Sequence, residues 1–223
     1  MRIELRTVAR FILTLTLLGV MVAAAVPALA QDLYEDFVLA VANDRAREVR
    51  SLLARGIDPD TVDKRGDPVV VVAARAGNRE TVQALLEGGA KVNKPNIVGD
   101  TAIMVAALNG HIEIVRMLRA RRASIDSDTP TWTPLMYAAT GGHDAIVQYL
   151  LKEGAKLNAA SPNGTTALMM AVRESHPSTI QLLLDSGANV NMRNENGATA
   201  LSWAEERDDT DAIKRLRRAG AKP

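Results

Sequence analysis

The sequence predicts an all-α solenoid, in which short pairs of helices stack one behind another. The first observation is a phrase that recurs with a period of about 33 residues, with its clearest copy from Thr133 to His143. The second is an apolar, Leu-rich phrase that follows each copy, as in residues 147–151. The third is an aromatic content of only 3%, which suits a core of Ala, Val, Leu and Met. A fixed period of this length indicates one structural unit repeated along the chain.

Residues 1–30 have the composition of a secretory signal peptide. Three arginines within residues 2–10 precede an apolar run over 11–26, and Ala28-Leu29-Ala30 matches an A-x-A cleavage site. We expect cleavage after Ala30 and export to the periplasm of a Gram-negative bacterium. An uncleaved membrane anchor is the alternative, although the apolar run is shorter than the roughly 20 residues that a spanning helix needs.

The remaining chain carries almost no net charge. Removal of the leader takes away three arginines and Glu4, so that 27 basic and 26 acidic residues become 24 and 25. No global field therefore favours nucleic acid or an anionic membrane as a partner. The absence of cysteine excludes disulfide stapling and thiol catalysis.

Residues 31–62 predict a divergent first unit that closes the N-terminal end of the stack. Leu33, Phe37 and Val41 lie four residues apart, as one face of a helix requires. Leu52 lies one repeat period before Leu85, so the apolar skeleton of the second helix is also kept. The polar residues between these positions suit a terminal unit whose outer face meets water.

Fuller units follow, each with the same signals for two helices. A threonine such as Thr133 can cap the first helix, and Pro134 at the first helical position loses no hydrogen bond there. A glycine such as Gly154 can end the second helix, and pairs such as Asn163-Gly164 can reverse the chain. The expected boundaries are 63–95, 96–128, 129–160, 161–193 and 194–223.

The repeated phrases resemble the ankyrin repeat over residues 31–223. This resemblance implies an ankyrin-repeat solenoid of about six helix-turn-helix repeats with β-hairpin-like loops. Four departures from the family pattern stand out. Pro68-Val69 replaces Thr-Pro, Arg122 stands where the terminating glycine belongs, and Pro177 begins a second helix. The repeat from Thr129 is one residue short in its loop, with Pro130-Thr131-Trp132 where an Asn-Gly turn is expected.

The three histidines occupy one repeat position rather than a metal site. His111, His143 and His176 occupy the repeat position that in the family is a structural Gly-His between the two helices, whereas metal ligands would need to lie within bonding distance of one ion. Neither a nucleophile paired with a base nor a phosphate-binding glycine loop stands out in the sequence. We therefore expect no metal, no cofactor and no enzymatic activity.

Two basic runs end second helices, at residues 116–122 and 214–218. Cations are favoured near a helix C-terminus, so a solvated face is the simpler interpretation. A surface for an anionic partner is the alternative.

The resemblance implies a concave protein-binding surface made of loop tips and first helices. Trp132 attracts most interest, because large aromatics dominate interface energies, although the short loop could instead fold it onto neighbouring apolar residues. Trp203 is expected at a core-facing position that closes the stack. Carried over position by position, the surface includes Asp67, Arg75, Asp100, Leu108, Asn109, Trp132, Thr140, Arg173, Glu174 and Ala198.

The expected function is a non-enzymatic protein-protein interaction module in the periplasm. The partner is a protein whose identity the sequence does not reveal, and the chain is expected to act as a monomer without nucleic acid or membrane. The alternative is an accessory protein that supports or inhibits an exported enzyme, for example in oxidative defence.

Overall fold

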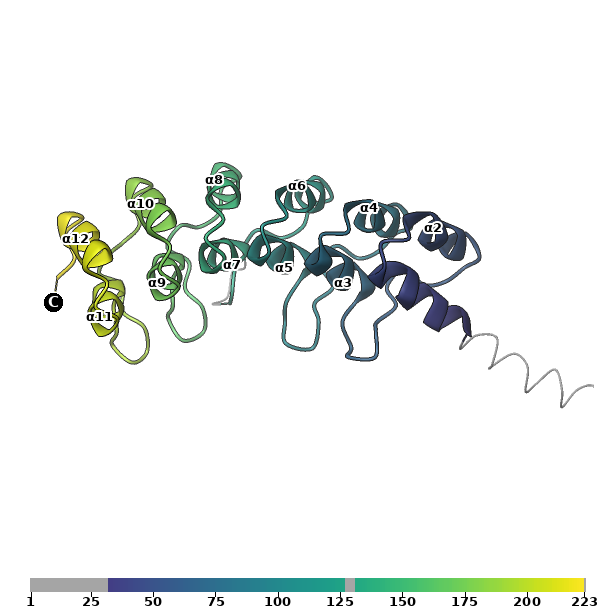
Figure 1. Cartoon of the computed structure of the whole chain (residues 1–223), viewed down its shortest axis with the longest axis horizontal. Helices are drawn as coiled ribbons and strands as arrows, with labels where there is room; N and C mark the ends of the chain where they lie inside the picture. The colour runs from purple at the N-terminus through teal and green to yellow at the C-terminus, as the bar shows by residue number, and fades with distance from the viewer. Residues whose placement is uncertain (1–31, 127–130, 223) are drawn as a thin grey trace, which may run out of the picture.

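Paired helices follow one another along the whole described chain. A computed structural model describes residues 32–126 and 131–222, so the predicted leader lies outside the described residues. The first helices form one row and the second helices another, and the long loops extend beyond the first row (Figure 1). The helices are 32–42, α2 (Ala46–Ala54), α3 (Val69–Ala76), α4 (Arg79–Glu87), α5 (Ala102–Leu108), α6 (Ile112–Ala120), α7 (Pro134–Thr140), α8 (Asp144–Lys152), α9 (Ala167–Arg173), α10 (Pro177–Asp185), α11 (Ala200–Glu206) and α12 (Thr210–Arg218).

The predicted all-α repeat solenoid is confirmed. Residues 32–126 and 131–222 contain no strand, only an isolated antiparallel bridge between Val62 and Pro68. Across the same residues, no helix combines the length and the apolar character needed to span a bilayer. The shape follows from the repeat, because one helix pair cannot bury its own apolar face and must stack on the next pair.

Small residues let the first helices approach one another closely. Helices α3, α5, α7, α9 and α11 each contact the next in this row. Ala106 and Ala107 of α5 and Ala138 and Ala139 of α7 are fully buried. A methyl group at these positions fills the interface, whereas a longer side chain would force the helices apart.

The N-terminal unit has the core that its sequence predicts. Phe37 and Val41 of helix 32–42 are fully buried, as are Val49 and, nearly, Leu52 of α2. The C-terminal unit is closed by Trp203 of α11, which is partly buried and packs against the core. Both end units therefore contribute apolar residues to the core of the stack.

Threonine caps begin most of the first helices, as the sequence predicts. The hydroxyl of Thr133 accepts a hydrogen bond from the backbone N–H of Met136 at 3.3 Å, and Thr166 and Thr199 do the same for α9 and α11. Helix α3 differs, because Pro68 occupies its capping position and its side chain accepts no hydrogen bond. Pro134 and Pro177 are the first residues of α7 and α10, as predicted.

Left-handed residues end the second helices. Gly89, Gly154, Gly187 and Gly220 have φ between 88° and 94°, a conformation that costs glycine nothing. Arg122 takes the equivalent position with φ of 64°. The Cβ atom of a non-glycine residue makes this conformation costly.

We expect Arg122→Gly to stabilise the protein by about 0.5–1 kcal/mol. Glycine removes the backbone strain from the folded state, and the greater conformational entropy of the unfolded chain offsets only part of this gain. The measurement is urea unfolding of both proteins. Arg121→Gly is the control, since Arg121 has a negative φ of −95° and its side chain donates to the carbonyl of Leu86 at 2.8 Å. A stability gain in the control, or a loss in Arg122→Gly, would contradict this explanation.

Candidate functional site

A ladder of histidines holds neighbouring first helices in register. The Nε2 atoms of His111, His143 and His176 lie 3.3, 2.9 and 2.9 Å from the carbonyl oxygens of Arg75, Leu108 and Thr140, each in the preceding repeat. Each ring also covers a glycine of that repeat. A Cβ atom on Gly77, Gly110 or Gly142 would come within 2.5–2.6 Å of the ring. These contacts give the histidines a structural role, and they fix the backbone of three predicted surface residues.

The loops between repeats are held by side chains at their bases. The Oδ1 atom of Asn96 accepts hydrogen bonds from the N–H groups of Val98 and Asp100, at 3.1 and 2.8 Å. Asp63 and Asn194 hold the corresponding loops in the same way. The loops therefore present their tips as ordered turns beside the first helices. In the short loop, residues 127–130 lie outside the described part of the chain.

Asp67 and Arg75 form an ion pair within one repeat. An Arg75 guanidinium N–H donates to Oδ2 of Asp67 at 2.7 Å, and the carboxylate side chain is only 9% exposed. Burial alone would raise the pKa of Asp67, but hydrogen bonds from Arg75 and Asn96 and the nearby arginine charges outweigh burial and lower the pKa. The pair ties the loop end to helix α3.

We expect this ion pair to contribute stability that disappears in acid. Because the pKa of Asp67 is lower in the folded state, its contribution is complete above the unfolded value of 3.8 and is lost as pH falls through the folded value. Asp67→Asn should cost about 1 kcal/mol at neutral pH, a figure reduced for the partial exposure of Arg75. Unfolding of both proteins by urea at neutral pH and well below pH 3.8 measures this difference. Asp36→Asn, at an exposed position, is the control, and a loss that persists unchanged in acid would contradict the assignment.

Asp100 and Tyr137 connect two successive repeats. The Tyr137 hydroxyl donates a hydrogen bond to Oδ1 of Asp100. Burial, this hydrogen bond and the charge of Asp100 together raise the pKa of Tyr137 far above its usual value. The phenol therefore stays protonated and serves as a fixed donor.

A hollow of about 140 Å³ lies beside Tyr137 on the first-helix row. We call it the central hollow, and it is lined by Leu108, Trp132, Tyr137, Thr140 and Met170. Trp132 packs edge-on against Tyr137, with ring centroids 6.2 Å apart and an angle of 83° between the rings. The indole is partly exposed, so it both packs on its neighbour and lines the hollow. Trp132 is thus folded onto a neighbouring side chain and still has part of its surface accessible.

The central hollow brings together only some of the predicted surface residues. Leu108, Trp132 and Thr140 line it. Asp100 accepts a hydrogen bond from Tyr137, which also lines it. Asn109 is exposed and bonds back to the Val105 carbonyl. The remaining residues lie elsewhere on the row of loops and first helices. They are the Asp67–Arg75 pair, the exposed Arg173–Glu174 pair at 2.9 Å and the partly exposed Ala198.

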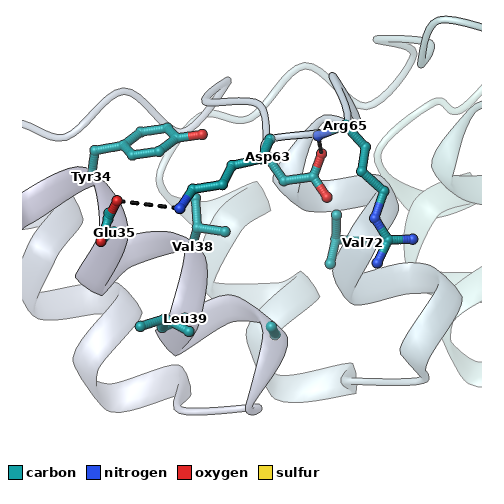
Figure 2. Close-up of a pocket in the computed structure, with 9 residues that line it drawn as sticks. Tyr34, Glu35, Val38, Leu39, Asp63, Arg65 and Val72 are labelled. Carbon is teal, nitrogen blue, oxygen red and sulfur yellow. Dashed lines mark hydrogen bonds and ion pairs between the residues drawn. The ribbon is translucent and has the colours of Figure 1, made fainter. Parts of the chain in front are cut away.

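A second hollow, of about 350 Å³, opens at the N-terminal end and was not among the predicted features. Figure 2 shows Val38, Leu39 and Val72 on its floor and Tyr34 and Arg65 at its sides. Lys64 also lines the hollow and pairs with Glu35 at 3.3 Å. Leu39 is 55% exposed, which is unusual for a leucine in a packed helix. Leu39 lies one repeat period before Val72, so the repeat register places this hollow on the same surface.

The basic run of α6 is mostly engaged within the chain. Arg119 donates to the Ala123 carbonyl and lies 3.7 Å from Glu153, while Arg121 donates to Leu86. Arg116 lies over the Tyr149 ring, 5.6 Å from its centroid. Several of these arginines therefore contact neighbouring repeats, and neither the solvated face nor the anionic partner predicted for this run is tested by these contacts.

Metal ligands do not gather in the part of the chain that the structure describes. No group of three or more His, Asp or Glu residues there could hold an ion. The site's chemistry therefore consists of apolar side chains, two aromatic rings and a few charged groups.

Comparison with known proteins agrees with the architecture. The family described as "Ankyrin repeats (3 copies)" matches residues 37–129, 93–161 and 135–223. No curated protein matches the chain. Proteins of the matched family generally mediate protein-protein interaction. The matched ranges include both hollows except for Tyr34 and Glu35, and they extend through the helix pairs to residue 223. The chain therefore belongs to the ankyrin-repeat family.

Proposed function

We propose that this protein is a non-enzymatic interaction module of the periplasm, which acts as a monomer and holds a protein partner against its loops and first helices. The observation that supports this most strongly is the central hollow. The partly exposed Trp132 and Tyr137 line it together with the apolar side chains of Leu108 and Met170. Partly exposed aromatics around a small apolar depression are typical of residues that dominate binding energy.

The surface is well suited to binding because it is held in place before a partner arrives. The histidine ladder fixes the carbonyl groups of Leu108 and Thr140, and the Asp100–Tyr137 hydrogen bond orients the tyrosine ring. A rigid site loses less conformational freedom on binding than a flexible one. The helical frame thus supports affinity without taking part in any reaction.

The periplasmic location is supported by the composition of residues 1–30. Its test is the mass and N-terminal sequence of the protein recovered from the cell envelope. The proposal expects a chain that begins at Gln31 in the periplasmic fraction. A chain that keeps the leader and sediments with membranes would show an anchored protein instead.

The binding function can be tested with a substitution that the repeat itself tolerates. Arg75 and Arg173 occupy the same repeat position as Thr140, so Thr140→Arg should fold normally while placing a charge over the central hollow. We expect this variant to lose a partner that the natural protein captures from periplasmic extract at a fixed ratio. The expected loss of affinity is about 100-fold, because one desolvated charge at an apolar contact costs on the order of 3 kcal/mol.

Tyr149→Ala is the matched control, since Tyr149 lies on α8 in the other row of helices. The control should retain the partner. If Thr140→Arg captures the partner as well as the natural protein does, the central hollow is not the binding site. An exported enzyme that the module supports or inhibits would be recognised in this experiment as the captured protein.

A further inference from the structure

Asp67 and Asp100 occupy the same position in successive repeats, but among the described residues only Asp67 of these two forms an ion pair with a cation. The residue that pairs with Asp67 is Arg75, eight positions later, at 2.7 Å. Eight positions after Asp100 the chain has Leu108. The repeat therefore keeps the carboxylate and replaces its cationic partner with an apolar side chain.

Asp100 has one side-chain partner among the described residues, the hydroxyl of Tyr137. None of the ion pairs within residues 32–126 and 131–222 includes it. A carboxylate that accepts one hydrogen bond has further lone pairs with which to bind a donor. A carboxylate on a partly buried side chain attracts a cation more strongly than it would in bulk water.

The same tyrosine connects this carboxylate to the central hollow. The ring of Tyr137 lines the hollow together with Leu108, and its hydroxyl ends at Asp100. Leu108 thus belongs to the hollow at the position where the preceding repeat has Arg75. Tyr137 consequently connects an apolar depression to a carboxylate that has no ion pair among the described residues.

We infer that the partner brings an arginine or lysine to Asp100 and, next to it, a large apolar side chain into the central hollow. The partner's cation would replace the one that Arg75 provides in the preceding repeat. This inference rests on the proposed function and adds the chemistry of the partner. A partner segment with an acidic residue at this point would be repelled by Asp100, so the site also discriminates by charge.

The test is a selection of random short peptides on the purified protein, followed by affinity measurements. We expect the selected peptides to carry Arg or Lys close in sequence to a large apolar residue. Asp100→Asn should weaken them about tenfold, because it removes the charge and keeps the size of the side chain. Replacement of the peptide's basic residue by Gln should weaken binding to a similar extent. Both changes together should weaken it little more than either one, which is the mark of a direct pair.

Two controls separate this inference from the proposed function. Thr140→Arg blocks the central hollow itself, whereas Asp36→Asn removes an exposed carboxylate of helix 32–42. The contrary result is a set of selected peptides that lose binding to Thr140→Arg and yet lack basic residues, or that bind Asp100→Asn as tightly as they bind the natural protein. Such peptides would overturn the inference and leave the proposed function standing. If no selected peptide depends on Thr140, both are overturned.

Discussion

Replacing Gly142 with alanine is expected to lower the free energy of unfolding by about 3 kcal/mol. Gly142 has φ of 68°, and a Cβ atom there would lie 2.5 Å from Nδ1 of His176. The ring cannot move away easily, because its Nε2 atom is bonded to the carbonyl of Thr140 at 2.9 Å. Strain and steric overlap therefore add, and urea unfolding measures the sum.

Gly154→Ala separates the two contributions. Gly154 has φ of 92°, but nothing lies within 4 Å of the place that an added methyl group would take, so only the backbone strain of about 1–2 kcal/mol applies. The variant Gly142→Ala with His176→Ala should show a smaller loss than the two single losses added together. Equal losses for Gly142→Ala and Gly154→Ala would show that the histidine contact is unimportant.

Replacing Ala106 with leucine is expected to cost about 3 kcal/mol or more. Ala106 is fully buried where α5 contacts α7, and its neighbour Ala107 is buried as well. Three additional carbon atoms would push the two helices apart and disturb the carbonyl of Leu108, which His143 holds at 2.9 Å. Thermal and urea unfolding would detect the loss.

Ala120→Leu provides the matched control, because Ala120 is exposed at the end of α6. This change should alter stability by less than about 0.5 kcal/mol. A small effect of Ala106→Leu as well would mean that the first helices are spaced loosely, and the explanation of the buried alanines would be wrong.

Repeat periodicity made most of the fold predictable. The cap at Thr133, the first-turn prolines at 134 and 177 and the left-handed glycine at 154 all depend on a few neighbouring residues. Such local rules operate in the same way in every copy, so several registered copies reinforce one prediction. The divergent first unit could be recognised because its buried Phe37 and Val41 keep the helical spacing.

The candidate site was only partly predictable, because its contacts cross from one repeat to the next. Asp100 and Trp132 were expected on the surface, but their shared contact with Tyr137 depends on how closely two repeats approach. The N-terminal hollow was missed because residues 31–62 lack the threonine phrase that marked the surface elsewhere. The exposed Leu39, one period before Val72, is the signal that could have revealed it.

Site-specific photo-crosslinking in the living cell tests the central claim most directly. A photoreactive phenylalanine derivative is placed at the exposed Asn109, which follows Leu108 of the central hollow in sequence, or at Tyr149, on the other row of helices. We expect the protein with the probe at Asn109 to form one discrete crosslinked product with another protein, and the protein with the probe at Tyr149 to form none. Crosslinking from Tyr149 but not from Asn109 would contradict a binding surface on the loops and first helices.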